Sequence, residues 1–398
     1  MKNLFLTILF LTSTLLFIAQ PNTWIKMTDY TGNAVSAASA FIVGNTAYLC
    51  GGYDGGSYKV SLHRYNQPFD VWEKITDFPA MPRNKAVSFA IGGKAYYGTG
   101  QGLLQYSQDF WKFDTVTLTW TQIADITGAP RNGACGVSTN GKGYVGLGQS
   151  STGLLNDWWE YNPTTNTWAS KPNFIGTARK QASAFVATGK CYVTCGNDGG
   201  YKNDTYAFDP LLNTWTSKAS FAGTPRYDAT SFVIGNSGFV GLGYDNTLAY
   251  KNDVWQYNAY TNVWAQMSDF AGTAREGAIA FVLNNEAYVG LGYDNLFKND
   301  IWKYTPNIGV GINESIVINN IQNVYPNPAK EIITVLLKEN TPNSTLKIIN
   351  MQGLVLLEQQ ITDNVQKINI SDLAQGAYYI TVSNGQHFNT SKRFIKID

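Results

Sequence analysis

Five arginines recur along the chain at intervals of 47 to 49 residues. A guanidinium group offers a planar set of donors that fits carboxylate or sulfate groups. One hypothesis is that the arginines bind an anionic sugar or an acidic peptide. The other is that each arginine fixes an adjacent repeat through backbone carbonyl groups, which is favoured because a residue found in nearly every repeat usually serves the repeat itself. The five are Arg83, Arg131, Arg179, Arg226 and Arg275.

The residues directly after each arginine differ between repeats, so the repeat structure does not dictate them. They are the pairs Asn84-Lys85, Asn132-Gly133, Lys180-Gln181, Tyr227-Asp228 and Glu276-Gly277. Such a mixed polar set suits recognition of a sugar or a peptide, although a solvated loop rim would have the same composition. The candidate ligand-binding residues are the five arginines together with Asn84, Asn132, Lys180, Tyr227, Asp228 and Glu276.

Composition argues against several other chemistries. The chain has two histidines, His63 and His387, too few for a His-based zinc site, so we expect no metal and no cofactor. The formal net charge is +1 and basic residues form no cluster, which argues against nucleic-acid binding. The four cysteines are predicted to be buried as free thiols, with one bridge between neighbouring repeats as the alternative. They are Cys50, Cys135, Cys191 and Cys195.

The elements that position these residues follow from a second recurring set. Six tryptophans, at positions 24, 72, 120, 168, 215 and 264, keep the same period as the arginines. Within the second unit, Ala86–Ile91 and Ala95–Gly100 read as a hairpin, Asp109–Phe113 as a third strand and Trp120 as the start of a fourth. Six such units predict an all-β, six-bladed β-propeller. In five units an Asp opens the third strand, where we expect it to accept backbone hydrogen bonds.

The two ends of the repeat region are out of phase with each other. The last unit stops after its third strand at Tyr304, whereas Trp24–Met27 is a fourth strand with no unit before it. We therefore predict that the N-terminal strand completes the sixth blade and leaves no open sheet edge.

The repeat resembles the kelch family over residues 22–306, because each unit combines a Gly-rich end to the second strand with spaced Tyr and Trp residues. The resemblance implies that the arginines lie near the mouth of a central channel. Kelch proteins include copper-radical oxidases, whose two histidines this region lacks. They also include secreted propellers that interconvert sialic acid anomers without a metal, so a sugar isomerase that uses Asp228, Glu276 and the arginines is the alternative to a binding module.

The C-terminal part has a different composition, with no Trp after residue 302. Alternating apolar residues predict an Ig-like β-sandwich over residues 324–398, after a linker at 306–323. The segments Val324–Pro328, Gly376–Ile380 and Lys392–Lys396 resemble the C-terminal sorting domain of bacterial type IX secretion. An ordinary Ig-like adhesion module is the alternative. The resemblance implies that the type IX secretion machinery is a partner of this domain.

At the other end of the chain, an apolar run from Leu4 to Ala19 follows Lys2, which predicts a cleaved signal peptide over residues 1–20. No later segment is apolar enough to predict a membrane span. The propeller is therefore expected over residues 21–305. The sequence predicts a secreted or surface-displayed protein, first exported to the periplasm, whose propeller binds a glycan or a protein and is not expected to be an enzyme.

Overall fold

The computed structural model describes residues 22–306, 321–338, 344–350, 355–383 and 388–398. The chain divides into two compact units, residues 1–307 and 308–398. The predicted signal peptide and most of the predicted linker lie outside the described residues.

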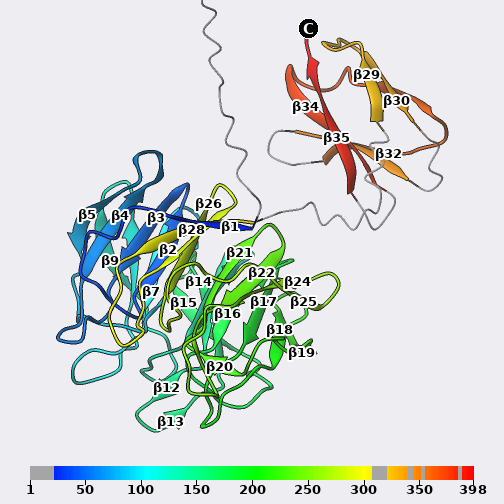
Figure 1. The fold of residues 1–398 in the computed structure, drawn as a ribbon. Helices are drawn as coiled ribbons and strands as arrows, with labels where there is room; N and C mark the ends of the chain where they lie inside the picture. Colours follow the sequence, from blue (N-terminus) through cyan, green and yellow to red (C-terminus); the bar gives the residue numbers. More distant parts are fainter. Residues whose placement is uncertain (1–21, 307–320, 339–343, 351–354, 384–387) are drawn as a thin grey trace, which may run out of the picture. The chain divides into compact units, whose positions relative to one another are not determined.

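Residues 22–306 contain six four-stranded antiparallel sheets, here called blades 1 to 6 (Figure 1). Blade 1 consists of β2 (Ser39–Val43), β3 (Thr46–Cys50), β4 (Ser61–Asn66) and β5 (Val71–Asp77). Blade 2 consists of β6 (Val87–Ile91), β7 (Lys94–Gly98), β8 (Phe110–Asp114) and β9 (Thr119–Ile123). Blade 3 consists of β10 (Cys135–Thr139), β11 (Lys142–Gly146), β14 (Trp158–Asn162) and β15 (Thr167–Lys171).

Blade 4 consists of β16 (Ser183–Ala187), β17 (Lys190–Thr194), β18 (Thr205–Asp209) and β19 (Thr214–Lys218). Blade 5 consists of β21 (Thr230–Ile234), β22 (Ser237–Gly241), β24 (Val254–Asn258) and β25 (Val263–Gln266). Blade 6 consists of β26 (Ile279–Leu283), β27 (Glu286–Gly290), β28 (Ile301–Thr305) and β1 (Thr23–Lys26). Five short elements lie in the loops: β12 (Gln149–Ser150) pairs with β13 (Gly153–Leu154), β20 (Arg226–Tyr227) pairs with β23 (Tyr244–Asp245), and a 3-10 turn covers Gln67–Phe69.

The N-terminal strand completes blade 6. In the antiparallel pairing of β1 with β28, Trp24 lies opposite Tyr304 and Thr23 opposite Thr305. The Trp24 ring also packs on Phe270, and its Nε1 donates to the Ser268 carbonyl at 3.2 Å, next to blade 5. The predicted pairing of the first strand with the last unit is therefore present.

The innermost strands of the blades contact one another in sequence. They follow the order β2, β6, β10, β16, β21 and β26, and β26 in turn contacts β2. Side-chain hydroxyl groups on these strands donate to backbone carbonyls of the adjacent blade, as Ser39 does to Ala86 at 2.9 Å and Ser183 to Ala229 at 2.8 Å. These strands thus surround a central channel and hold neighbouring blades in register.

The recurring tryptophans join blades rather than face a ligand. Nε1 of Trp168, Trp215 and Trp264 donates to a backbone carbonyl in the segment before its own blade, at 2.9 to 3.0 Å. Their rings pack on buried aromatic side chains from two blades, such as Phe221 and Tyr257 around Trp264. Burial of this aromatic surface supplies much of the interface between blades.

The C-terminal unit has two sheets that share one apolar core, as the sandwich prediction requires. One contains β29 (Ile321–Tyr325), β30 (Ile332–Leu337) and β33 (Val365–Asn369); the other contains β32 (Val355–Gln360), β31 (Thr345–Ile349), β34 (Gly376–Ser383) and β35 (Phe388–Lys396). Ile333 of the first sheet and Ile348 of the second are fully buried in that core. Among the described residues of the whole chain, no helix has the length and apolar character needed to cross a membrane.

Candidate functional site

The five repeat arginines are buried inside the propeller, with at most 1% of each side chain exposed. Each guanidinium forms a bidentate ion pair with the aspartate at the start of the third strand of its own blade. In blade 3, Nη1 and Nη2 of Arg131 donate to Asp157 at 2.5 and 2.6 Å, Nη1 also donates to the Leu147 carbonyl, and Nε donates to Ala129. The same arrangement joins Arg83 to Asp109, Arg179 to Asp204, Arg226 to Asp253 and Arg275 to Asp300.

These contacts correct the expectation that the arginines face a ligand at the channel mouth. Arg83, Arg179, Arg226 and Arg275 also lie over phenylalanine rings, about 5 Å from the ring centre. The guanidinium donors are already used within the blade, so the arginines serve the repeat. The aspartates accept mainly from arginine, where the sequence predicted backbone donors.

The channel mouth is formed by the residue two positions after each arginine and by its counterpart in blade 1. Their backbone amides and carbonyls form a ring of six hydrogen bonds of 2.7 to 3.1 Å, in which each N–H donates to the carbonyl of the preceding blade. All six have a left-handed backbone, with φ between 48° and 60°. This conformation is unfavourable for side chains other than glycine, and such strain is concentrated at functional sites. The six are Ala37, Lys85, Gly133, Gln181, Asp228 and Gly277.

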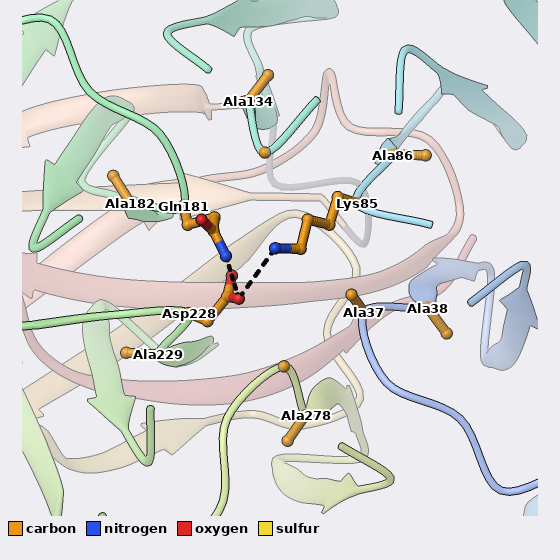
Figure 2. Close-up of a pocket in the computed structure, with 12 residues that line it drawn as sticks. Ala37, Ala38, Lys85, Ala86, Ala134, Gln181, Ala182, Asp228, Ala229 and Ala278 are labelled. Carbon is orange, nitrogen blue, oxygen red and sulfur yellow. Dashed lines mark hydrogen bonds and ion pairs between the residues drawn. The ribbon is translucent and has the colours of Figure 1, made fainter. Parts of the chain in front are cut away.

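Three side chains of this ring meet over the channel (Figure 2). Lys85 and Asp228 belong to blades 2 and 5, opposite each other in the ring, and their Nζ and Oδ2 atoms lie 3.5 Å apart. Gln181 donates from Nε2 to the same Asp228 oxygen. Six alanines, one per blade, surround the three side chains: Ala38, Ala86, Ala134, Ala182, Ala229 and Ala278.

The cavity at the mouth has a volume of about 140 Å³. That is room for one ring-sized group rather than for a whole oligomer. Deeper in the channel, Ala, Ser, Thr and Gly residues of the inner strands line a second cavity of about 220 Å³. Lys85 and Gln181 are absent from the candidate set, and the structure adds them to Asp228 as the polar side chains of the mouth cavity.

The remaining candidates lie one position earlier, where each backbone pairs with the turn after the second strand of its blade. Nδ2 of Asn132 donates to Oε1 of Gln101 at 2.9 Å, and Nζ of Lys180 donates to Oε1 of Gln149 at 2.6 Å. The two glutamine side chains, in blades 2 and 3, are thus each linked to the next blade. Burial lowers the pKa of Lys180, and the charge of Lys85 acts in the same direction.

Glu276 is the candidate with the most unusual environment. Burial, followed by the negative charge of Asp228, raises the pKa of its carboxyl to about 7, while Lys85 and Tyr227 act in the opposite direction. Its Oε2 atom is buried and has no hydrogen-bond partner among the described residues, and the same is true of Oδ1 of Asn84. A carboxyl that titrates near neutrality and an unsatisfied acceptor are both typical of binding and catalytic sites.

A continuous series of aromatic rings lies beside the mouth, and the candidate set from the sequence includes only one of them, Tyr227. Eight partly exposed rings contact one another with centroid separations of 4.9 to 6.2 Å. They come from the loops of blades 4, 5, 6 and 1. We call the set the aromatic arc, in spatial order Tyr201, Tyr227, Tyr244, Tyr250, Tyr293, Phe297, Tyr53 and Tyr58.

Comparison with models of known protein families identifies a match for the propeller. The Attractin/LZTR1 beta-propeller model matches residues 47–302. The chain belongs to the Attractin/LZTR1 beta-propeller family. Among solved structures, the chain is similar to the one titled "Structure of YjhT", with 15% identity and a TM-score of 0.59, over 70% of this chain and 95% of that chain. At this identity the similarity shows the fold alone. A search of curated proteins finds no match.

A second family model, the secretion system C-terminal sorting domain, matches residues 323–397. This confirms the predicted type IX sorting domain. The propeller is therefore exported by type IX secretion to the cell surface or to the outside. Among the described residues, no group of three or more His, Cys, Asp or Glu side chains is placed to hold a metal ion.

Proposed function

We propose that this Attractin/LZTR1-type propeller is a glycan-binding module whose ligand binds at the channel mouth. The observation that supports the proposal is a polar cavity and an aromatic arc on the same face of the propeller. The Asp228 carboxylate and the Gln181 amide line the cavity and can accept hydrogen bonds from hydroxyl groups, and tyrosine rings pack against the apolar faces of sugars. Six hydrogen bonds close the backbone ring at the mouth, so little ordering is required when a ligand binds.

A glycan array with the full-length protein tests the proposal. We expect Asp228→Ala to weaken binding of the bound glycans at least about tenfold, because a hydrogen bond to a charged group contributes about 1.5 to 3 kcal/mol. The matched control is Asp209→Ala, which also breaks a lysine pair, to Lys190 at 3.0 Å, but at the opposite end of a blade. If no glycan binds, the proposal is refuted and a protein ligand takes its place.

A second candidate is a metal-independent sugar isomerase. It is supported by Glu276, whose raised pKa and closeness to Asp228 suit general acid–base chemistry. The arginines cannot clamp a substrate carboxylate in this mechanism, because they are paired inside the blades. Lys85 and Lys180 are the cations nearest the mouth. NMR observation of anomer exchange in sialic acid, with wild type and Glu276→Gln, tests this candidate: equal rates with and without protein exclude it.

We further propose that the sorting domain begins near Val324 and that residues 1–20 are a signal peptide. Deletion of residues 324–398 is then expected to leave the propeller in the periplasm. Cell fractionation with an antibody against the propeller measures this. Arrival of the truncated protein at the cell surface or in the medium contradicts the assignment.

A further inference from the structure

The aromatic arc lies on only one side of the channel mouth. Blades 4, 5, 6 and 1 supply its eight rings. The matching loop of blade 2 carries Gln101 and Tyr106, which is not part of the arc, and that of blade 3 carries Gln149. Its members contact one another through loops of successive blades, with 5.1 Å between Tyr201 and Tyr227 and 6.2 Å between Tyr250 and Tyr293. Because the blades are arranged around the channel, a path along these rings must curve.

The arc reaches the mouth at Tyr227. This residue directly precedes Asp228 of the mouth cavity, and its phenol interacts with the carboxyl of Glu276. The mouth cavity, at about 140 Å³, has room for one ring-sized group. A ligand that fills the mouth with its end group therefore continues over the arc.

The charged residues in the four loops that carry the arc form ion pairs with each other. In each of its four blades, the turn after the second strand carries an aspartate that pairs with a lysine of the same loop. These pairs are Asp54 with Lys59, Asp198 with Lys202 at 2.9 Å, Asp245 with Lys251 at 3.4 Å and Asp294 with Lys298 at 2.8 Å. A track of aromatic rings between neutralised charges gives no electrostatic preference for an anionic or a cationic chain.

We infer that the ligand is a neutral, curved oligosaccharide, of the α-1,4-linked glucan type, bound with one end residue in the mouth and successive residues on the aromatic arc. This inference rests on the proposed glycan-binding function. Alpha-1,4-linked glucans follow a curved path, whereas β-1,4-linked glucans are straight ribbons, so the curvature of the arc selects between them. Stacking on several rings makes affinity rise with chain length.

Isothermal titration of the full-length protein with glucose, maltose, maltotetraose and maltohexaose is the direct test. We expect affinity to increase at least about tenfold from the monosaccharide to the tetrasaccharide, since each added sugar residue packs on a further ring of the arc. Cellotetraose, and an oligogalacturonate of the same length, are expected to bind at least about tenfold more weakly than maltotetraose.

Variants of the arc provide a second test. Tyr250→Ala and Tyr293→Ala should each weaken maltotetraose binding about fivefold or more, while Tyr250→Phe should retain it because the ring remains. The matched control is Tyr106→Ala, which removes a partly exposed tyrosine from the corresponding loop of blade 2, outside the arc. Thermal melting of each variant shows whether it folds, and the length series on wild type needs no variant.

The outcomes separate this inference from the function on which it rests. Equal affinity for all chain lengths, or equal effects of Tyr250→Ala and Tyr106→Ala, overturns the role of the arc but leaves glycan binding at the mouth. Tighter binding of cellotetraose or of the oligogalacturonate overturns the assigned ligand class. If no saccharide on the array or in titration binds, the proposed function fails, and this inference with it.

Discussion

Replacing Glu276 with Gln should stabilise the propeller at alkaline pH and leave its stability almost unchanged at pH 4. The pKa of this carboxyl is raised from 4.5 to about 7, mainly by burial. A group whose pKa rises this far on folding favours the protonated form by about 3 kcal/mol. Below pH 4.5 the group is protonated in both the folded and the unfolded chain, so it does not reduce the free energy of unfolding. Above pH 7 the folded protein must bury the charged carboxylate, and the free energy of unfolding of the wild type is lower by the whole of this amount.

The expected observation is a difference in the free energy of unfolding between Glu276→Gln and wild type that grows by about 3 kcal/mol from pH 4 to pH 8. Guanidinium denaturation followed by tryptophan fluorescence measures it. Tryptophan reports on the propeller alone, because all 11 tryptophans precede residue 324.

The control is Glu73→Gln, which removes an exposed carboxylate paired with Arg64 at 2.6 Å. We expect a change below about 1 kcal/mol, with little dependence on pH. A difference for Glu276→Gln that is the same at every pH would refute the buried, protonated state of this residue.

Three further predictions follow from the packing. Arg131→Ala should lower the free energy of unfolding by about 3 to 5 kcal/mol, because it leaves the Asp157 carboxylate without its ion pair. Arg131→Lys should restore only part of this free energy, since an ammonium group cannot bond to both carboxylate oxygens at once. Denaturant midpoints measure both changes. Deletion of residues 22–27 exposes the edge of β28 and should abolish the cooperative melting transition in calorimetry, so an unchanged transition argues against ring closure by β1. All four cysteines are buried and burial raises the pKa of each thiol, so the folded protein should not react with a thiol reagent at pH 8, whereas four groups should react after denaturation.

The fold could be predicted from the sequence because each blade repeats the same strand pattern with the same residue types at fixed positions. The period of the tryptophans predicted the sheets, and the phase of Trp24 predicted its pairing with Tyr304. A further signal was available in the first unit, which has Val35 in the arginine position and Ser61 in the aspartate position. Loss of both residues together indicates that they are partners, and the structure shows this pairing in the other five blades.

The site was harder to predict because it depends on contacts between distant blades. Lys85 and Asp228 are 143 residues apart, and only the closed ring brings them within 3.5 Å. Tyr53, Tyr244 and Tyr293 occur in the sequence next to turn-forming Asp residues, where they read as parts of turns. Their contact with rings from neighbouring blades depends on loop conformation, which the repeat period does not determine.

The differences between blades therefore explain function better than their common features do. The repeat arginines and aspartates pair with each other inside the propeller, and the recurring tryptophans pack between blades, so these residues are not available to a ligand. The same backbone ring that these residues support places the variable side chains of Lys85, Gln181 and Asp228 over the channel. Exchange of Lys85, Gln181 or Asp228 for another side chain would alter the mouth without disturbing a strand, because these positions already hold a side chain on a left-handed backbone. A side chain at Gly277 would instead add backbone strain and clash with Ser36. A repeat architecture of this kind can thus change ligands by single substitutions at the mouth, while the pairs that hold the blades together stay fixed.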